Sequence, residues 1–141
     1  MGRVVVKIKL TNFTDLELQN QGLLKGEPRS IEVETLVDTG ATRLLLQRGV
    51  IQALGLRRLA TERYRTVNGD CERGRYAPVH LELMDRNGEF NVMEVPDDVP
   101  NLLGQIPLEE MDLVVDCKNR CLVGNPEHGG QWMTEMYPSE S

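Results

Sequence analysis

The sequence is poor in the residues that build disulfide frameworks and metal centres. Its 141 residues include three cysteines and two histidines. An odd number of cysteines without framework spacing argues against a disulfide-stapled fold, and two widely separated histidines argue against a zinc site. We therefore expect Cys71, Cys117 and Cys121 to be free thiols, and we expect no metal and no cofactor.

Long apolar runs and an excess of positive charge are also missing. No apolar run approaches the roughly 18 residues that a membrane-spanning helix needs. Residues 1–10, MGRVVVKIKL, lack the long apolar core of a secretion signal. Sixteen basic against 22 acidic residues leave a net charge of −6, whereas a nucleic-acid partner requires a dense basic surface. These absences predict a cytoplasmic protein with no membrane and no nucleic-acid partner.

Short strand patterns dominate what is present. Residues 4–10 and 30–38 are rich in β-branched residues and alternate apolar with polar positions, as half-buried strands do. Later segments of the same kind are joined by turn signals and predict three hairpins. The predicted hairpin turns are Asn68-Gly69, Asn87-Gly88 and residues 118–120.

Two short helices complete the predicted fold. One covers residues 47–54 and is closed by Gly55, and the other begins at Pro107 with acidic residues in its first turn. The result is an all-β domain over residues 1–124, a closed barrel or sandwich of short antiparallel strands with two short helices. Residues 125–141 are polar and aperiodic, and we expect a flexible or dimer-associated tail there.

A single carboxylate stands at the end of the second predicted strand, in the stretch LVDTGAT at residues 36–42. An Asp before Thr-Gly often only caps a turn, and this is the simplest interpretation of the tripeptide alone. An apolar strand, however, delivers Asp38 from the core, which a solvent-exposed turn does not need. Gly40 lets backbone N–H groups approach the carboxylate, and Ala41 leaves room for a substrate. A second apolar motif, Leu102-Leu103-Gly104, stands directly before the second predicted helix.

The order of these elements resembles the retropepsin-like aspartic proteases, the single-domain family that includes the retroviral proteases. The matching parts are LVDTGA at residues 36–41, a candidate flap hairpin at 66–74 and LLG at 102–104. The resemblance extends over roughly Val4 to Val123. It implies a retropepsin-like fold and an aspartic endopeptidase that hydrolyses polypeptides.

The resemblance also implies a site shared between two chains. One chain supplies one Asp38, so the family's pair of catalytic carboxylates would come from a homodimer whose twofold axis passes between them. The pair would share a proton, one carboxylate acting as general base on a water and the other donating to the scissile carbonyl. Supporting roles would fall to Thr39, Gly40 and Ala41 around the dyad, to Val67, Asn68, Gly69 and Asp70 in a substrate-binding flap, and to Leu102, Leu103 and Gly104 as a structural motif.

Three features depart from the retroviral pattern. Thr42 stands where retroviral members have an Asp, and Gln105 follows LLG where an Arg begins their final helix. The Arg–Asp contact that braces retroviral dimers is therefore not expected here. The candidate flap is also polar, where retroviral flaps are apolar and Gly-rich. These departures leave dimer strength and substrate preference open and favour a bacterial-type member of the family.

Two other functions stay open at the level of sequence. The same fold can serve as a binding or dimerisation module with little or no proteolytic activity, because a fold does not determine a function. Cys117 and Cys121 could form a redox pair, but their separation differs from CxxC and only Lys118 and Arg120 lie near enough to activate a thiol. A turn with two incidental thiols is the preferred interpretation.

Overall fold

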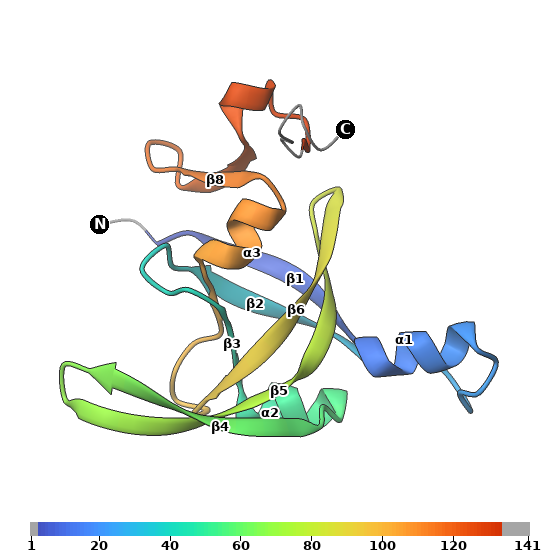
Figure 1. Ribbon diagram of the computed structural model, residues 1–141. Coiled ribbons are helices and arrows are strands. Elements are labelled where there is room, and N and C mark those ends of the chain that lie inside the picture. The colour runs from blue at the N-terminus through green and yellow to red at the C-terminus, as the bar shows by residue number, and fades with distance from the viewer. Residues whose placement is uncertain (1–2, 134–141) are drawn as a thin grey trace, which may run out of the picture.

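The computed structural model describes residues 3–133, in which β-strand is the predominant secondary structure (Figure 1). This confirms the all-β prediction at the level of fold class. In chain order the elements are β1 (Val5–Asn12), α1 (Phe13–Asn20), β2 (Ser30–Val37), β3 (Leu44–Gln47), α2 (Arg48–Leu54), β4 (Arg58–Thr66), β5 (Gly69–Leu83), β6 (Arg86–Val95), β7 (Leu102–Leu103), α3 (Gln105–Glu110), β8 (Leu113–Asp116), β9 (Cys121–Gly124) and a short 3₁₀ helix (Pro126–His128). None of the helices in this part of the chain is long and apolar enough to cross a membrane.

Seven strands form one sheet in the order β1-β2-β7-β3-β6-β5-β4, and β1 also pairs with β5. The pairings therefore lead from β1 through five other strands and back to β1. Strands β8 and β9 pair separately as a hairpin. Only antiparallel strands were expected, but the β2–β7 and β3–β6 pairings are parallel. The reason for the first is geometric: β7 lies between two strands of opposite direction, so it is parallel to β2 and antiparallel to β3.

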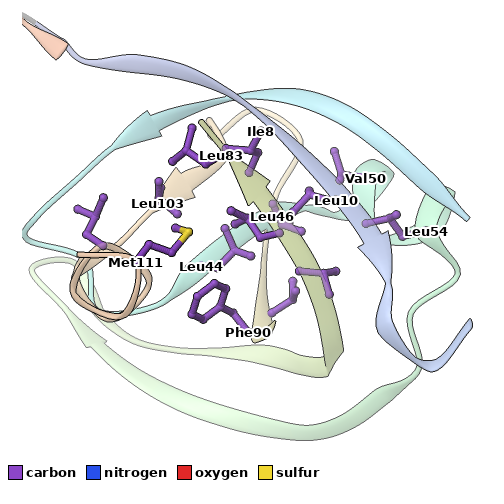
Figure 2. Close-up of a cluster of buried hydrophobic side chains, with 14 of the residues drawn as sticks. Ile8, Leu10, Leu44, Leu46, Val50, Leu54, Leu83, Phe90, Leu103 and Met111 are labelled. Atoms are coloured by element: carbon purple, nitrogen blue, oxygen red, sulfur yellow. The ribbon is translucent and has the colours of Figure 1, made fainter. Parts of the chain in front are cut away.

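Apolar side chains from the sheet and from two helices meet in one core (Figure 2). In β1 the alternation is as predicted, since Ile8 and Leu10 are buried while Lys7 and Lys9 are exposed. Leu103 of β7 is also fully buried, which anchors the second apolar motif. Burial of an aliphatic side chain of this size contributes about 1.5–3 kcal/mol.

Helix α1 was not predicted, and its contacts explain why. Its buried residue is Asp15 rather than an apolar stripe, so hydrophobic periodicity cannot reveal it. Asn12 precedes the helix and its side chain accepts a hydrogen bond from Asp15 N (3.0 Å). Asp15 in turn binds Arg29 through both carboxylate oxygens, at 2.9 and 3.0 Å. Polar contacts hold this helix, and the domain has three α-helices within residues 3–133 rather than the two expected.

The hairpin joining β5 and β6 turns at residues 84–85, and the prediction of a turn at Asn87-Gly88 was wrong. Both residues lie within β6, whose buried Arg86 donates to the carbonyl of Met111 (2.7 Å). Gly88 serves a different need, because a Cβ there would lie 2.7 Å from the ring of Phe90. A glycine that makes room for a ring was mistaken for a turn glycine.

Smaller shifts affect two other boundaries. The β4–β5 hairpin turns at Val67-Asn68, one residue earlier than expected, and Gly69 opens β5 with φ 110°. Helix α3 begins at Gln105 rather than at Pro107. Helix α2 ends as predicted, since Gly55 adopts the left-handed conformation with φ 63°.

The C-terminal part of the described chain has several contacts with the domain. The β8–β9 hairpin is present as predicted, with its turn at residues 117–120 where 118–120 was expected, and all three cysteines are free. In the predicted tail, His128 Nδ1 lies 2.6 Å from Asp112 Oδ2, and Trp132 Nε1 donates to Glu110 O (3.1 Å). Residues 134–141 of that tail lie outside the described residues.

Candidate active site

Asp38 is the first residue after β2, and it is half-buried. Its backbone N–H donates to Leu103 O (3.0 Å), which continues the β2–β7 ladder by one bond. Its carboxylate accepts a hydrogen bond from Gly40 N (2.9 Å), and its carbonyl accepts one from Ala41 N (3.1 Å). The loop is therefore a tight turn that holds one carboxylate directly after strand β2.

The two sequence motifs lie against each other in the fold. Strand β7 passes between β2 and β3, the strands that enter and leave the Asp38 loop. The first two residues of α3 then bind the loop itself, with Gln105 N donating to Ala41 O (2.8 Å) and Ile106 N to Thr42 O (2.9 Å). The first N–H groups of a helix have no acceptor within the helix itself, and here the loop carbonyls accept their hydrogen bonds.

Gly104 allows the second motif to pack closely against the Asp38 loop. A Cβ at this position would lie 2.7 Å from Ala41 O and 2.8 Å from Arg43 N. Its φ is −92°, so the requirement for glycine comes from close approach of two backbones and not from the dihedral angle. Any larger residue would separate the Leu102–Gly104 segment from the Asp38 loop.

Asn101, directly before β7, is a further support that sequence reasoning missed. It is buried, its Oδ1 accepts from Gln47 N (2.8 Å), and its Nδ2 donates to Glu34 O (3.2 Å). Its own carbonyl accepts from Leu36 N (2.8 Å). One amide side chain thus ties together the strands on both sides of the loop. No local pattern marks it, because its partners lie 54 and 67 residues away.

The face of the loop is open. Thr39 and Gly40 are exposed, and a cavity of about 500 Å³ opens beside Asp38 and Thr39. Its remaining walls come from the two residues before β1, the end of β2, α3 and β8, and from Cys117 just after β8. The Asp38 carboxylate is therefore accessible to water and to a larger molecule.

The candidate flap is the outer part of the β4–β5 hairpin, which projects beyond the rest of the sheet at the lower left of Figure 1. At its turn Val67 is fully exposed. Asp70 lies 3.7 Å from Arg63 and 3.9 Å from Arg65, both on the opposite strand. Asn68 completes the turn, and Gly69 opens β5.

A charged link joins this hairpin to the segment that follows the Asp38 loop. Glu62 of β4 lies 2.9 Å from Arg75 Nε of β5 and 3.9 Å from Arg43 Nη1. All three side chains are partly exposed. Sequence reasoning did not find Arg43 or Glu62. The available signal was the position of Arg43, which directly follows LVDTGAT and directly precedes β3.

The chemistry open to this arrangement is limited by its single carboxylate. The loop contains no histidine and no second acid, and no group of three or more His, Cys, Asp or Glu within residues 3–133 is arranged to hold a metal ion. A lone carboxylate can accept a proton from water. Acid–base catalysis on a peptide bond also requires a proton donor, which must come from elsewhere.

A predominantly β domain with an accessible Asp-Thr-Gly loop braced by Leu-Leu-Gly has the features of an aspartyl-protease type of domain. The family model described as gag-polyprotein putative aspartyl protease matches residues 25–110. This range covers more than half of the chain, including the Asp38 loop, the β4–β5 hairpin and β7. The chain belongs to this family, which confirms the retropepsin-like resemblance found in the sequence. No curated protein matches the chain.

Proposed function

We propose that this chain is an aspartic endopeptidase that acts as a homodimer, with Asp38 of each copy facing the other across the twofold axis. The observation that carries the proposal is the Asp38 loop. Its carboxylate is oriented by Gly40 N, its backbone is bonded to β7 and α3, and its outer face is open. Membership of an aspartyl-protease family supports the same chemistry. A retropepsin-like closed barrel is part of the proposal, and the pairing of β1 with both β2 and β5 supports it.

The dyad would supply both proton transfers that peptide hydrolysis requires. Two carboxylates at close range cannot both be charged, so the two Asp38 side chains would share one proton. The charged carboxylate takes a proton from water as the water oxygen bonds to the scissile carbonyl carbon. The protonated carboxylate donates its proton to the carbonyl oxygen. As the tetrahedral intermediate collapses and its C–N bond breaks, the carboxyl that took the water's proton gives that proton to the leaving amine. The other carboxylate takes a proton from a hydroxyl of the intermediate, which restores the starting dyad.

The neighbouring residues would hold the dyad and the substrate. The exposed Thr39 would hydrogen-bond to the partner's loop across the axis, and Gly40 N would keep the carboxylates in plane. The β4–β5 hairpin would cover an extended polypeptide, with residues 67–70 adding backbone hydrogen bonds to it. We place this reaction in the cytoplasm.

Substitution of the proposed catalytic residue tests the proposal most directly. Asp38→Asn removes the acid without changing its shape, and hydrolysis of an unfolded polypeptide should fall by about 10³-fold or more. Asp98→Asn is the matched control, because Asp98 is exposed in the loop between β6 and β7 and should leave the rate unchanged. Sedimentation should show the same dimer for wild type and both variants. An Asp38→Asn variant with wild-type activity would overturn the proposal.

The alternative function is a binding or dimerisation module of the same fold. A dimer that forms normally but hydrolyses no polypeptide between pH 3 and 8 would decide for that alternative. Sensitivity of any observed hydrolysis to a general aspartic-protease inhibitor separates the enzyme from a contaminating protease of another class.

Ala41 adds a prediction about pH. A Ser or Thr at this position would donate a hydrogen bond that favours a charged dyad, and Ala41 has no such donor. We therefore expect activity to extend to higher pH than in pepsin-like enzymes. Ala41→Ser should shift the pH–rate profile down by about one pH unit, the equivalent of one hydrogen bond. Val67→Ser adds a hydroxyl at the hairpin turn and should leave the profile in place. A wild-type optimum near pH 2 to 3 with no activity by pH 5.5 would contradict this expectation.

A further inference from the structure

Glu94 is a buried carboxylate for which the proposed reaction has no use. It lies on β6, and only 7% of the residue is exposed. A buried carboxylate without partners is strongly unfavourable, so its surroundings should show what it does. Three other elements, α2, β4 and β5, supply those surroundings.

The partners of Glu94 converge from both strands of the β4–β5 hairpin. Oε1 accepts from the backbone N–H of Gly74 (2.8 Å), and Oε2 accepts from the hydroxyl of Tyr76 (3.2 Å). Arg48 Nε of α2 lies 3.4 Å from Oε2, and Arg58 Nη1 of β4 lies 3.9 Å from Oε1. Burial raises the pKa of Glu94, but these donors and the two arginines outweigh burial and hold the pKa below its usual value. The carboxylate is therefore charged at neutral pH.

These contacts fall where the hairpin leaves the body of the domain. Strand β5 pairs with β6 from Arg75 onward, whereas residues 69–74 pair with β4 alone. We call residues 60–74 the arm. A two-stranded hairpin is only marginally stable by itself in water, so its direction depends on what holds its base. The register is also irregular on both sides of this point, between Arg58 and Ala60 and between Tyr76 and Val79.

Gly74 fits the carboxylate closely. A Cβ there would lie 3.1 Å from Glu94 Oε1, 3.1 Å from Arg58 Cζ and 2.9 Å from the ring of Tyr76. The φ of Gly74 does not require glycine, since it is outside the positive range. The space at the base of the arm is thus filled by the carboxylate and its donors, and a side chain at position 74 would displace them.

We propose that Glu94 is a positioning residue whose carboxylate holds the base of the arm and so sets the angle at which the arm stands over bound substrate. The other polar link at the base, Arg43–Glu62–Arg75, is partly exposed, and exposed ion pairs contribute little. The buried contact through Glu94 is therefore the dominant one. The role in substrate binding rests on the proposed function, because it takes the arm to be the flap. The structural role of Glu94 does not.

Glu94→Gln tests the structural role, because it keeps the shape of the side chain and removes its charge. Amide hydrogen exchange without substrate should become about tenfold faster in the arm and stay unchanged in β1, β2 and β7. Asp15→Asn is the matched control: its side chain is 5% exposed against 9% for Glu94, and it binds Arg29 far from the arm. It should leave exchange in the arm unchanged. Equal protection of the arm in wild type and Glu94→Gln, or equal loss in Asp15→Asn, would overturn the proposal.

Kinetics test the role in substrate binding. Glu94→Gln should raise KM for a polypeptide about fivefold with kcat within twofold, because the arm contributes to binding and not to the proton transfers. Tyr76→Phe removes one hydrogen-bond donor to Glu94 with little change in packing. It should give a smaller change in both arm exchange and KM. This second variant keeps the test valid if Glu94→Gln folds poorly. Faster arm exchange with unchanged KM would refute the flap role and leave the base contact in place. Absence of hydrolysis in the wild type would refute the proposed function, and the exchange result would still decide the structural role.

Discussion

The Asp38 loop and the arm are held in opposite ways. The loop is bonded through its backbone: Asp38 N, Ala41 O and Thr42 O all have partners in β7 or α3, and Gly104 permits the close approach. The arm depends on side chains, above all on the charge of Glu94. Backbone hydrogen bonds do not titrate, whereas a carboxylate does. Under the proposed function, this difference would give a fixed catalytic carboxylate and an adjustable cover over the substrate.

Gly104→Ala should have the largest effect, because it breaks the backbone contact on which the loop depends. The added Cβ meets backbone atoms of Ala41 and Arg43 that cannot rotate away, and we expect a loss of about 3 kcal/mol in the free energy of unfolding. Chemical denaturation measures the loss. Gly49→Ala in α2 is the control, because its Cβ would be in ordinary contact at 3.5 Å from Asp97. Equal stability of the two variants would show that the loop is not held by close approach.

Asn101→Ala should come next, with a loss of about 1–3 kcal/mol, because it leaves Gln47 N and Glu34 O without their side-chain partner. Asn91→Ala removes a hydrogen bond of similar length to Tyr76 O (3.2 Å) from an exposed side chain. It should cost less than about 0.5 kcal/mol. The two denaturation midpoints measure the difference, and a larger effect at Asn91 would contradict the bracing role of Asn101.

Acid should lower amide protection more in the arm than in the Asp38 loop. The pKa of Glu94 is lowered, so its contribution is complete above the usual Glu pKa of about 4.3 and is lost as pH falls through the lowered value. The charged or titratable groups facing it are Arg48 of α2, Arg58 of β4 and Tyr76 of β5, and none of these changes charge in that range. Amide protection factors in the arm should therefore fall between pH 6 and pH 3.

The backbone-bonded amides of Gln105 and Ile106 provide the internal reference for that experiment. Their protection should fall less than protection in the arm over the same range. The Glu94→Gln variant should show low arm protection at both pH values, because it has no charge to lose. Parallel loss of protection in the loop and the arm would show that acid acts through global unfolding.

Val67→Ser should have the smallest effect on stability. Val67 is fully exposed at the hairpin turn, and a surface substitution of this kind changes stability by less than about 0.5 kcal/mol. Any effect should appear in KM for a polypeptide, since this position would contact substrate. A marked fall in melting temperature would show that the turn packs against another part of the molecule.

The sequence predicted a region well where the residues that contact one another are close together in the chain, and poorly where they are far apart. The Asp38 loop was predicted because its glycine, its carboxylate and the preceding apolar strand are neighbours in the chain. The base of the arm was not predicted, because Glu94 and Gly74 are 20 residues apart in the chain and meet only when β5 pairs with β6. Helix α1 was missed for a related reason, since its buried Asp15 is explained only by Arg29.

Local patterns alone determined the strand-rich class, the family resemblance and the position of the one carboxylate in its turn, because alternation and turn chemistry act over a few residues. Only the tertiary structure decided that β7 inserts between β2 and β3, that Gly104 must be a glycine, and that Gly88 makes room for Phe90 rather than forming a turn. These outcomes depend on which backbones and rings come within contact distance. That distance is a property of the folded chain and leaves no periodic trace in the sequence.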